Sequence, residues 1–135
     1  MEKLFEGSSC QAEYIPEKKR VFFMLNGYAK PDEHKEMYLK VLEFMKSNPV
    51  VAFMHDLRQM KGTFTQMNDW LVETFRPATQ LGFRSGALIL NDDVFTAFAA
   101  SDIINKAKIV QIQIFKTREE AEHWLDERLS EEYTI

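Results

Sequence analysis

The residues best placed to do chemistry lie between Asp56 and Thr65, where an apolar segment ends and a helix is expected to begin. Two cations, Arg58 and Lys61, and the hydroxyl groups of Thr63 and Thr65 follow Asp56 closely. The free N–H groups and positive dipole end of a helix N-terminus attract anions, and nearby cations strengthen that attraction. The pattern indicates a surface for phosphate, a phosphorylated hydroxyl or an acidic partner loop. The simpler interpretation is a threonine that caps the helix between solvated basic residues.

Acid–base and metal chemistry have weaker support in the sequence. His55 and Asp56 could form an acid–base pair, but neighbouring strand residues point to opposite faces, so the two do not easily serve one site. Asp56 could also hold a divalent cation together with Asp92 and Asp93. Acids directly before an expected helix are better explained as helix caps, and we therefore expect no metal site here.

Motifs for cofactor binding and nucleophilic catalysis are absent from the sequence. The glycine-rich phosphate-binding motifs and the serine nucleophile motif do not occur, and five glycines are too few to build a phosphate-cradling loop. Metal-ligand spacing is lacking for His34, His55 and His123, and Cys10 has no basic neighbour to activate it. We therefore expect no cofactor and no enzymatic activity.

Aromatic residues offer a second kind of site. Trp70 and Phe75 lie in the expected second helix, and Phe95 and Phe98 lie in the expected third helix. Packing in the core is the default interpretation of such periodic aromatic residues. The alternative is that they line a pocket between the sheet and these two helices, which would hold a small, apolar, lipid-like ligand.

The elements that position these residues follow from the hydrophobic pattern, which predicts an α/β fold in the order β-β-α-β-α-β-α-β-α. The expected strands are short apolar or alternating segments, at residues 11–15, 21–25, 50–54, 87–90 and 109–115. Helices are expected to begin near Pro31, Thr63, Asp93 and Thr117, each with a proline or a capping residue at its start. One domain should span residues 1–135, with a loosely ordered segment 1–9 and a C-terminal tail at 131–135.

The connections between these strands predict a mixed sheet. The first two strands are separated by a short turn and should be antiparallel, whereas a helix precedes each later strand and indicates parallel crossovers. The last strand alternates between apolar residues and Gln111 and Gln113, so one face should be wet and the strand should lie at an edge. An exposed edge of this kind makes a homodimer one of the expected partnerships.

Composition limits the remaining classes of function. The net charge is 17 − 21 = −4, which disfavours tight binding to nucleic acid or anionic membranes. The single cysteine excludes an intramolecular disulfide, and no segment approaches the roughly 20 apolar residues of a membrane helix. We expect a cytoplasmic protein that neither inserts into a membrane nor binds nucleic acid.

Four segments resemble a known family in their order and spacing. They are the strand-like segment 50–58, Val-Val-Ala-Phe-Met-His-Asp-Leu-Arg; the turn Lys61-Gly62-Thr63; the strand-like segment 87–90; and the close at 114–125, Ile-Phe-Lys-Thr-Arg-Glu-Glu-Ala-Glu-His-Trp-Leu. Together they resemble the STAS domains, the bacterial anti-anti-sigma-factor fold, and especially their SpoIIAA-like relatives. The resemblance covers roughly residues 11–130.

The resemblance implies a mixed five-stranded sheet and a non-enzymatic, regulatory role through contacts with a protein partner such as a kinase or another regulator. In anti-anti-sigma factors a partner kinase phosphorylates a serine at the start of the helix after the Asp-Leu strand. The matching position is Thr65, with Thr63 close by, but the usual Asp-Ser-Ser-Gly context is replaced by the segment 64–67, Phe-Thr-Gln-Met. A phosphoswitch here is therefore expected to be degenerate. Lipid-carrying domains have a related layout, which supports the apolar-ligand alternative.

Overall fold

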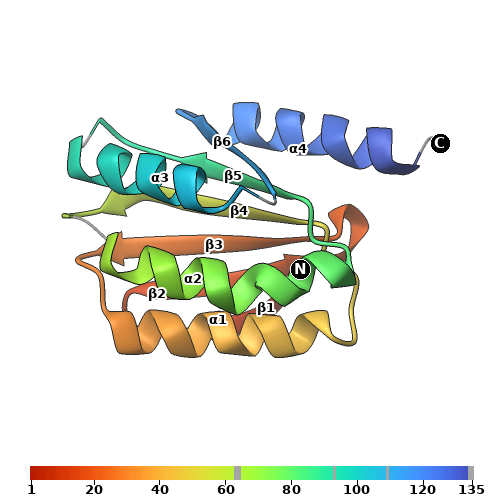
Figure 1. The fold of residues 1–135 in the computed structure, drawn as a ribbon, viewed down its shortest axis with the longest axis horizontal. Helices are drawn as coiled ribbons and strands as arrows, with labels where there is room; N and C mark the ends of the chain where they lie inside the picture. Colours follow the sequence, from red (N-terminus) through yellow and green to blue (C-terminus); the bar gives the residue numbers. More distant parts are fainter. Residues whose placement is uncertain (63–64, 93, 109, 134–135) are drawn as a thin grey trace.

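The computed structural model contains a mixed β-sheet with helices on both of its faces (Figure 1). The structure describes residues 1–62, 65–92, 94–108 and 110–133. Within these residues the strands are β1 Glu2–Glu6, β2 Cys10–Ile15, β3 Arg20–Gly27, β4 Ala52–Met60, β5 Ser85–Ile89 and β6 Gln111–Phe115. The α-helices are α1 Pro31–Met45, α2 Asn68–Phe75, α3 Val94–Lys106 and α4 Arg118–Tyr133. Short 3₁₀ turns form η1 Pro16–Lys18, η2 Thr65–Met67 and η3 Arg76–Leu81.

The order of the strands across the sheet is the order of the strands along the chain, β1-β2-β3-β4-β5-β6. The pairs β1–β2 and β2–β3 are antiparallel, and the pairs from β3 to β6 are parallel. A short turn joins β2 to β3, whereas the parallel strands are linked through helices, as their connection lengths require. The predicted α/β class and mixed sheet are thus confirmed.

One strand more is present than the sequence predicts, because β1 lies within the segment that was expected to be loose. Its sequence, Glu-Lys-Leu-Phe-Glu, has only two apolar residues and no strict alternation, so its pattern does not indicate a strand. Pairing with β2 makes it one, from Glu2 opposite Tyr14 to Glu6 opposite Gln11. As a consequence β2, the first strand predicted from the sequence, is an inner strand with β1 on one side and β3 on the other.

The turn between β1 and β2 is held by Glu33, near the start of α1. Its carboxylate accepts hydrogen bonds from Ser8 Oγ at 2.7 Å, from the Ser9 backbone N–H at 2.7 Å and from Ser9 Oγ at 2.9 Å. These hydrogen bonds hold the pKa of Glu33 at about 2, well below its usual value. One ionised side chain therefore fastens the first hairpin to the first helix.

The two faces of the sheet carry different layers. Figure 1 shows α1, α2 and α3 along one face, with α4 set apart from them. The larger core cluster joins α1, α2 and α3 to Phe23, Phe53 and Leu88 of the sheet. The smaller cluster packs Ala121 and Leu125 of α4 onto the opposite face of the sheet.

The helix starts agree with the sequence in two of four places. Pro31 occupies the first turn of α1, followed by two acidic residues. Ahead of α4, the backbone N–H of Glu120 donates to Thr117 Oγ1 at 3.2 Å and the Thr117 hydroxyl donates to the Glu120 carboxylate at 3.0 Å, which confirms the predicted cap. The predicted caps at Thr63 and Asp93 lie outside the described residues.

β4 is longer than predicted and absorbs part of the expected loop after Leu57. Parallel pairing with β3 continues to Gly27 opposite Met60. Leu57 and Met60 are both buried in the core, which anchors the strand beyond its continuous apolar segment. The first α-helical turn after β4 begins at Asn68, three residues later than Thr65, because residues 65–67 form η2.

A buried cation attaches α4 to the sheet. Arg20 Nη2 donates to Asp126 Oδ1 at 2.7 Å, and the Arg20 side chain is only 3% exposed. Lys18 Nζ lies 3.2 Å from the same oxygen. The contact between Arg20 and Asp126 joins residues that are 106 positions apart in the chain.

Candidate functional site

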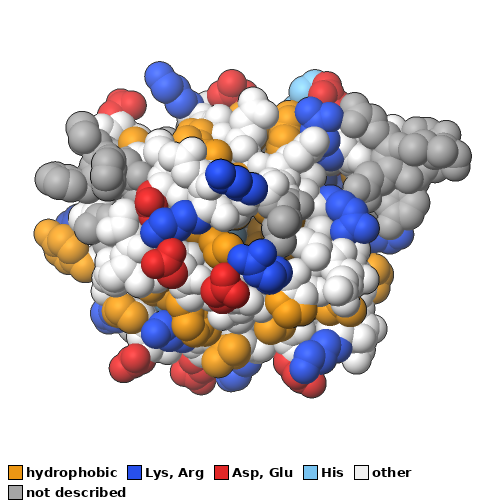
Figure 2. All heavy atoms as spheres, in the orientation of Figure 1, with side chains coloured by type: hydrophobic (Ala, Val, Ile, Leu, Met, Phe, Trp, Pro, Cys, Tyr) orange, Lys and Arg blue, Asp and Glu red, His pale blue; other side chains and the backbone are white. Residues whose placement is uncertain are grey.

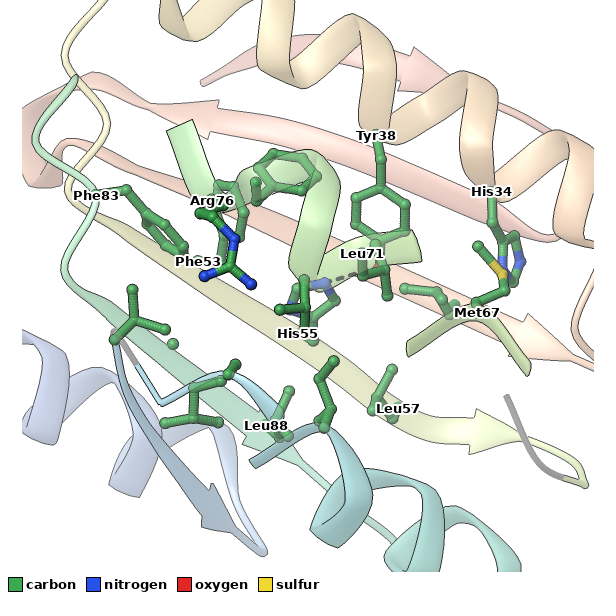
Figure 3. Close-up of a pocket in the computed structure, with 18 residues that line it drawn as sticks. His34, Tyr38, Phe53, His55, Leu57, Met67, Leu71, Arg76, Phe83 and Leu88 are labelled. Carbon is green, nitrogen blue, oxygen red and sulfur yellow. Dashed lines mark hydrogen bonds between the residues drawn. The ribbon is translucent and has the colours of Figure 1, made fainter. Parts of the chain in front are cut away.

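A pocket of about 120 Å³ lies between the sheet and the helices α2 and α3 (Figure 3). Its walls come from β4, β5, α1, α2, α3 and the segment that leads to β6. Most lining residues are apolar. The residues that set the shape and polarity of the pocket are Tyr38, Phe53, His55, Phe75, Arg76 and Gly86. The pocket therefore offers an apolar environment with a few polar groups, which is the usual composition of a small-molecule site.

The floor of the pocket is formed by neighbouring strand residues that share one face. Phe53 and His55 of β4 lie opposite Gly86 and Leu88 of β5 in register. Gly86 contributes no side chain, and a Cβ placed on it would meet only Ile112 Cγ1, at 3.6 Å, which is an ordinary van der Waals contact. The absence of a side chain at Gly86 leaves a space in the floor, between large neighbouring residues such as Phe53 and Leu88.

Aromatic rings pack around this space and fix one another. Phe23 stacks on the His55 ring with centroids 4.4 Å apart and planes at 12°. Phe53 makes an edge contact with Phe75 at 5.3 Å and a tilted contact with Phe83 at 4.3 Å. Offset and edge contacts of this kind are favourable for ring pairs. The pocket wall is therefore well packed on the side of the sheet.

Tyr38 and His55 form the polar contact within this apolar wall. The Tyr38 hydroxyl and His55 Nε2 are 2.9 Å apart, and Figure 3 shows the two side chains meeting from α1 and β4. Burial, together with the smaller effect of the neighbouring His34, lowers the pKa of His55 to about 3. Burial likewise raises the pKa of Tyr38. Both groups are therefore neutral near pH 7.

His34 is the second imidazole of the pocket wall. It is 1% exposed, and its Nε2 has no hydrogen-bond partner within the described part of the chain. Burial lowers its pKa, which Lys30 reinforces and Glu33 opposes. A neutral ring is the form that an apolar wall tolerates.

Arg76 brings a charge to the opening of the pocket. Its side chain is 53% exposed, and its Nη2 donates to Glu73 Oε1 at 2.8 Å. Figure 3 shows the guanidinium beside the cavity, on the same side as Phe53. In Figure 2 this face has a hollow near its centre, with hydrophobic side chains at the opening and basic and acidic ones around it.

Polar contacts between α2 and α3 close the outer wall. Asn68 Nδ2 donates to Asp102 Oδ2 at 2.9 Å, and Lys106 Nζ lies 3.1 Å from that same carboxylate oxygen. Lys106 Nζ also lies 3.0 Å from Oδ1 of Asp69, a residue of α2. The two helices that cover the pocket are thus attached to each other as well as to the sheet.

The residues singled out first in the sequence are distributed over both faces. Asp56 lies in register with Met24, which packs in the α4 cluster, so Asp56 faces α4 and His55 faces the pocket. Arg58 donates to both Asp56 carboxylate oxygens, through Nε at 3.0 Å and Nη2 at 2.8 Å. Burial opposes ionisation of Asp56, but the Arg58 hydrogen bonds outweigh it and lower the pKa of the carboxyl group. His55 and Asp56 therefore lie on opposite faces of the sheet, as predicted from the sequence.

The remaining residues of that predicted surface lie beyond the end of β4. Lys61 is exposed, and its backbone N–H donates to Gly27 O at 2.8 Å. Thr65 is partly buried and opens η2, ahead of α2 on the pocket side of the sheet. Thr63 lies outside the described residues. The structure thus pairs Asp56 with Arg58 and places Thr65 on the other side of the sheet.

The predicted pocket aromatics have different positions. Phe75 lines the pocket, between the Tyr38 and Phe53 rings. Trp70 packs against the core from α2 without lining the pocket, and Lys35 Nζ lies 5.5 Å from its ring centroid. The side chains of Phe95 and Phe98 lie outside the described part of the structure.

Sequence reasoning missed Tyr38, His34 and Arg76 as pocket residues and gave His55 a different role. Tyr38 lies on the predicted apolar stripe of the first helix, where it is indistinguishable from a core residue. The signal that could have separated these residues is the presence of a histidine within an apolar strand and another within an apolar helix face. Buried imidazoles need polar partners or a neutral state, and both requirements point to a special environment.

Among the described residues, no group of three or more His, Cys, Asp or Glu side chains is arranged to hold a metal ion. Asp92 is exposed, and Asp93 lies outside the described range. No described helix combines the length and the apolar character needed to cross a membrane.

Comparison with known proteins identifies the class of fold. The sequence matches no family model and no curated protein. A solved structure that resembles this one belongs to an uncharacterized protein of the DUF3478 family from Shewanella loihica PV-4, described as having a SpoIIAA-like fold. The TM-score is 0.57 at 15% sequence identity, over 78% of this chain and 83% of the other. The chain therefore has a SpoIIAA-like fold, as its resemblance to STAS domains predicts.

Proposed function

We propose that this SpoIIAA-like chain is a non-enzymatic binding module that holds a small apolar molecule between the sheet and the helices α2 and α3. The observation that carries the proposal is the pocket of about 120 Å³ whose lining is almost wholly apolar. Protein interiors are normally packed to crystal-like density, with few voids larger than a water molecule. An apolar space of this size, open at the surface, supports a role in binding a small molecule.

The volume indicates the size of the ligand. An engineered apolar cavity of about 150 Å³ takes up benzene. A pocket of about 120 Å³ therefore suits a single ring or a compact branched chain. A long-chain lipid would leave most of its chain outside, so the lipid-like ligand expected from sequence is reduced to a shorter molecule or to one end of a longer one.

The electrostatics of the pocket support binding rather than catalysis. A general base works best with a pKa near the operating pH. His55, with a pKa of about 3, is too weak a base to accept a proton near neutrality. Cys10, buried beside Glu33, has its pKa raised to about 12 by burial and by that carboxylate, so its thiol is a poor nucleophile.

The test is to fill the pocket from its floor. Gly86→Leu adds a side chain on the pocket side of β5, at a position where the backbone needs no positive φ. Toluene binding, followed by ligand-observed NMR, should be lost in Gly86→Leu while the variant stays folded by circular dichroism. Gly86→Ala is the matched control, because one methyl group leaves most of the volume free and should weaken binding only a few-fold. Unchanged toluene binding in a folded Gly86→Leu protein would rule out this pocket.

A second candidate is the regulatory protein-interaction module that the STAS-like resemblance implies. The SpoIIAA-like fold supports it, together with exposed Lys61 near Thr65 at the end of β4. A phosphate on Thr65 would add negative charge beside this cation. The partner would be a kinase or another regulator, and a second copy of the chain would pair along the edge strand β6.

This candidate is tested by affinity capture with the wild type and a Lys61→Glu/Thr65→Asp variant. Loss of one specific partner from the variant would support the surface. Identical partner sets, or none, would count against it. Light scattering of the purified protein separates a homodimer from a monomer.

A further inference from the structure

The charge distribution of the pocket is one-sided. Arg76 is the single charged residue among the described residues that line it, and no acidic side chain is among them. Both lining histidines have lowered pKa values because they are buried, so they add no positive charge near pH 7. The pocket therefore has an apolar interior, and the one charged residue of its described lining is Arg76, which is paired with Glu73 outside the lining.

The environment of Arg76 leaves it able to bind a second carboxylate. A guanidinium has five N–H donors, and here Nη2 is the one that Glu73 uses. Glu73 itself is 72% exposed and does not line the pocket. A carboxylate at the opening would keep part of its hydration, so its desolvation penalty would be far smaller than that of a fully buried ion.

We infer that the ligand is a compact amphipathic anion, whose apolar body fills the pocket and whose carboxylate lies at Arg76. This inference rests on the proposed function and adds the chemical class of the ligand. An apolar body of ring size matches the volume of about 120 Å³. An anionic head matches the single cation, with which it forms charge-assisted hydrogen bonds. A cationic head would be repelled, and a neutral head would lose the charge assistance.

Three probes with nearly the same apolar body separate these cases: phenylacetate, phenylacetamide and phenethylamine. Isothermal titration calorimetry at low salt should give phenylacetate an affinity about fivefold higher than phenylacetamide. Hydrogen bonds to charged groups are about twice as strong as neutral ones, and partial exposure of Arg76 reduces the gain. Phenethylamine should bind more weakly than phenylacetamide. Added salt should reduce the preference for phenylacetate and leave the affinity of phenylacetamide nearly unchanged.

Variants at the opening assign the preference to Arg76. Arg76→Gln should make phenylacetate and phenylacetamide bind equally, whereas Glu73→Gln should raise the phenylacetate affinity because it removes the competing carboxylate. Lys46→Gln is the matched control, since Lys46 and Glu43 form another surface pair three residues apart, at 3.0 Å, at the C-terminal end of α1, and neither residue lines the pocket. It should leave the preference unchanged.

The outcomes separate this inference from the proposal on which it rests. If phenylacetamide and toluene bind but phenylacetate gains nothing, or if Arg76→Gln keeps the preference, the anionic class is wrong and the apolar pocket stands. If toluene and all three probes fail to bind, the proposed function itself is wrong.

Discussion

Tyr38 and His55 place two polar side chains in a wall that is otherwise apolar, and their mutual hydrogen bond satisfies one polar atom of each. A buried polar atom without a partner destabilises a protein by about 1–3 kcal/mol. Replacing only Tyr38 or only His55 should therefore destabilise the protein more than replacing both with apolar residues. The same burial keeps both histidines of the pocket neutral. Because protonation of these buried histidines is unfavourable, the stability of the fold depends on pH.

We expect the free energy of unfolding to fall as the pH is lowered from about 6.5 towards 3. In the unfolded chain each histidine takes up a proton near its ordinary pKa of 6.5, whereas His55 in the folded protein stays neutral down to about pH 3. Between these values the unfolded state binds more protons, so His55 removes up to about 1.4 kcal/mol per pH unit, and His34, whose pKa is also lowered, acts in the same direction.

Urea unfolding at pH 7, 6 and 5 measures this slope. The variant Tyr38→Phe/His55→Phe removes both members of the pair and keeps the aromatic packing against Phe23, so its slope between pH 7 and 5 should be smaller than that of the wild type by the contribution of His55. His34, whose pKa is also lowered by burial, contributes in the same direction in both proteins. His123→Gln is the control, because His123 is exposed on α4 and pairs only with Glu127 among the described residues. An equal slope in the wild type and the double variant would contradict the prediction.

At the scale of elements, the first hairpin depends on a contact with a helix more than on its own sequence. β1 lies at the edge of the sheet and contributes few apolar residues. Glu33 supplies the missing specificity, because its carboxylate gathers donors from the turn between β1 and β2. A methyl group on Gly7 would lie 2.5 Å from Glu33 Oε1, so a side chain here would displace the carboxylate that holds the turn.

Glu33→Gln should loosen β1 while the rest of the sheet stays intact. The amide keeps one acceptor oxygen but loses the charge, and its NH₂ group cannot accept a hydrogen bond from the Ser9 backbone N–H or the serine hydroxyls. Hydrogen exchange of the β1 and β2 amides should become at least tenfold faster, with little change in β4 and β5. Glu36→Gln, one turn further along α1 in a surface pair with Lys40, should leave exchange unchanged.

The hairpin should also respond to acid in the wild type. The pKa of Glu33 is lowered to about 2, so its contribution is complete above about pH 4.5, the ordinary value, and is lost as the pH falls towards 2. Protection of the β1 amides should decline over this range and already be low in Glu33→Gln. If the variant kept the acid sensitivity, another carboxylate would have to hold the hairpin.

For the whole molecule, α4 is the element that closes the second face of the sheet. Ala121 and Leu125 pack on β4 and β5, and Asp126 reaches back to Arg20 at the start of β3. Arg118 at the start of α4 lies over the Phe22 ring at 4.4 Å and covers part of the sheet beyond the helix itself. The end of the chain thus shields strands from both halves of the sequence.

Asp126→Ala should destabilise the protein by about 2 kcal/mol, because it leaves the buried Arg20 guanidinium without its carboxylate. Breaking a fully buried pair costs about 3–5 kcal/mol, and partial exposure of Asp126 reduces that figure. Arg20→Met/Asp126→Ala should be less destabilised than the single variant, since the unpaired charge is gone. Glu122→Ala, which breaks the exposed Arg118–Glu122 pair, should change thermal stability by less than about 0.5 kcal/mol.

The sequence predicts the arrangement of the larger elements because their patterns are local. The apolar stripe of Tyr38, Val41 and Met45 is buried on α1, and the Thr117 cap starts α4 as expected. β1 could not be predicted, because its strand conformation depends on pairing with β2 and on Glu33. The same limit applies to the length of β4, whose last residues are fixed by Leu57 and Met60 in the core.

The candidate site was predictable only in outline. A pocket between the sheet and the second and third helices follows from the apolar faces, and Phe75 lies in its wall. Its actual chemistry depends on the meeting of Tyr38 and His55, on the space left by Gly86 and on the position of Arg76. These are long-range relations between residues from four elements, and no local pattern reports them.

The agreement between strand order and chain order has a consequence for biosynthesis. As the chain leaves the ribosome, each new strand meets a neighbour that has already emerged, and no strand has to insert between two that are already paired. The sheet therefore grows in one direction, from the Glu33-fastened hairpin towards β6. The helix α4 emerges last, after every strand that it covers. Until then the nascent sheet exposes Met54, Ala87 and Ile89 to solvent. This apolar face is where we expect a chaperone to bind.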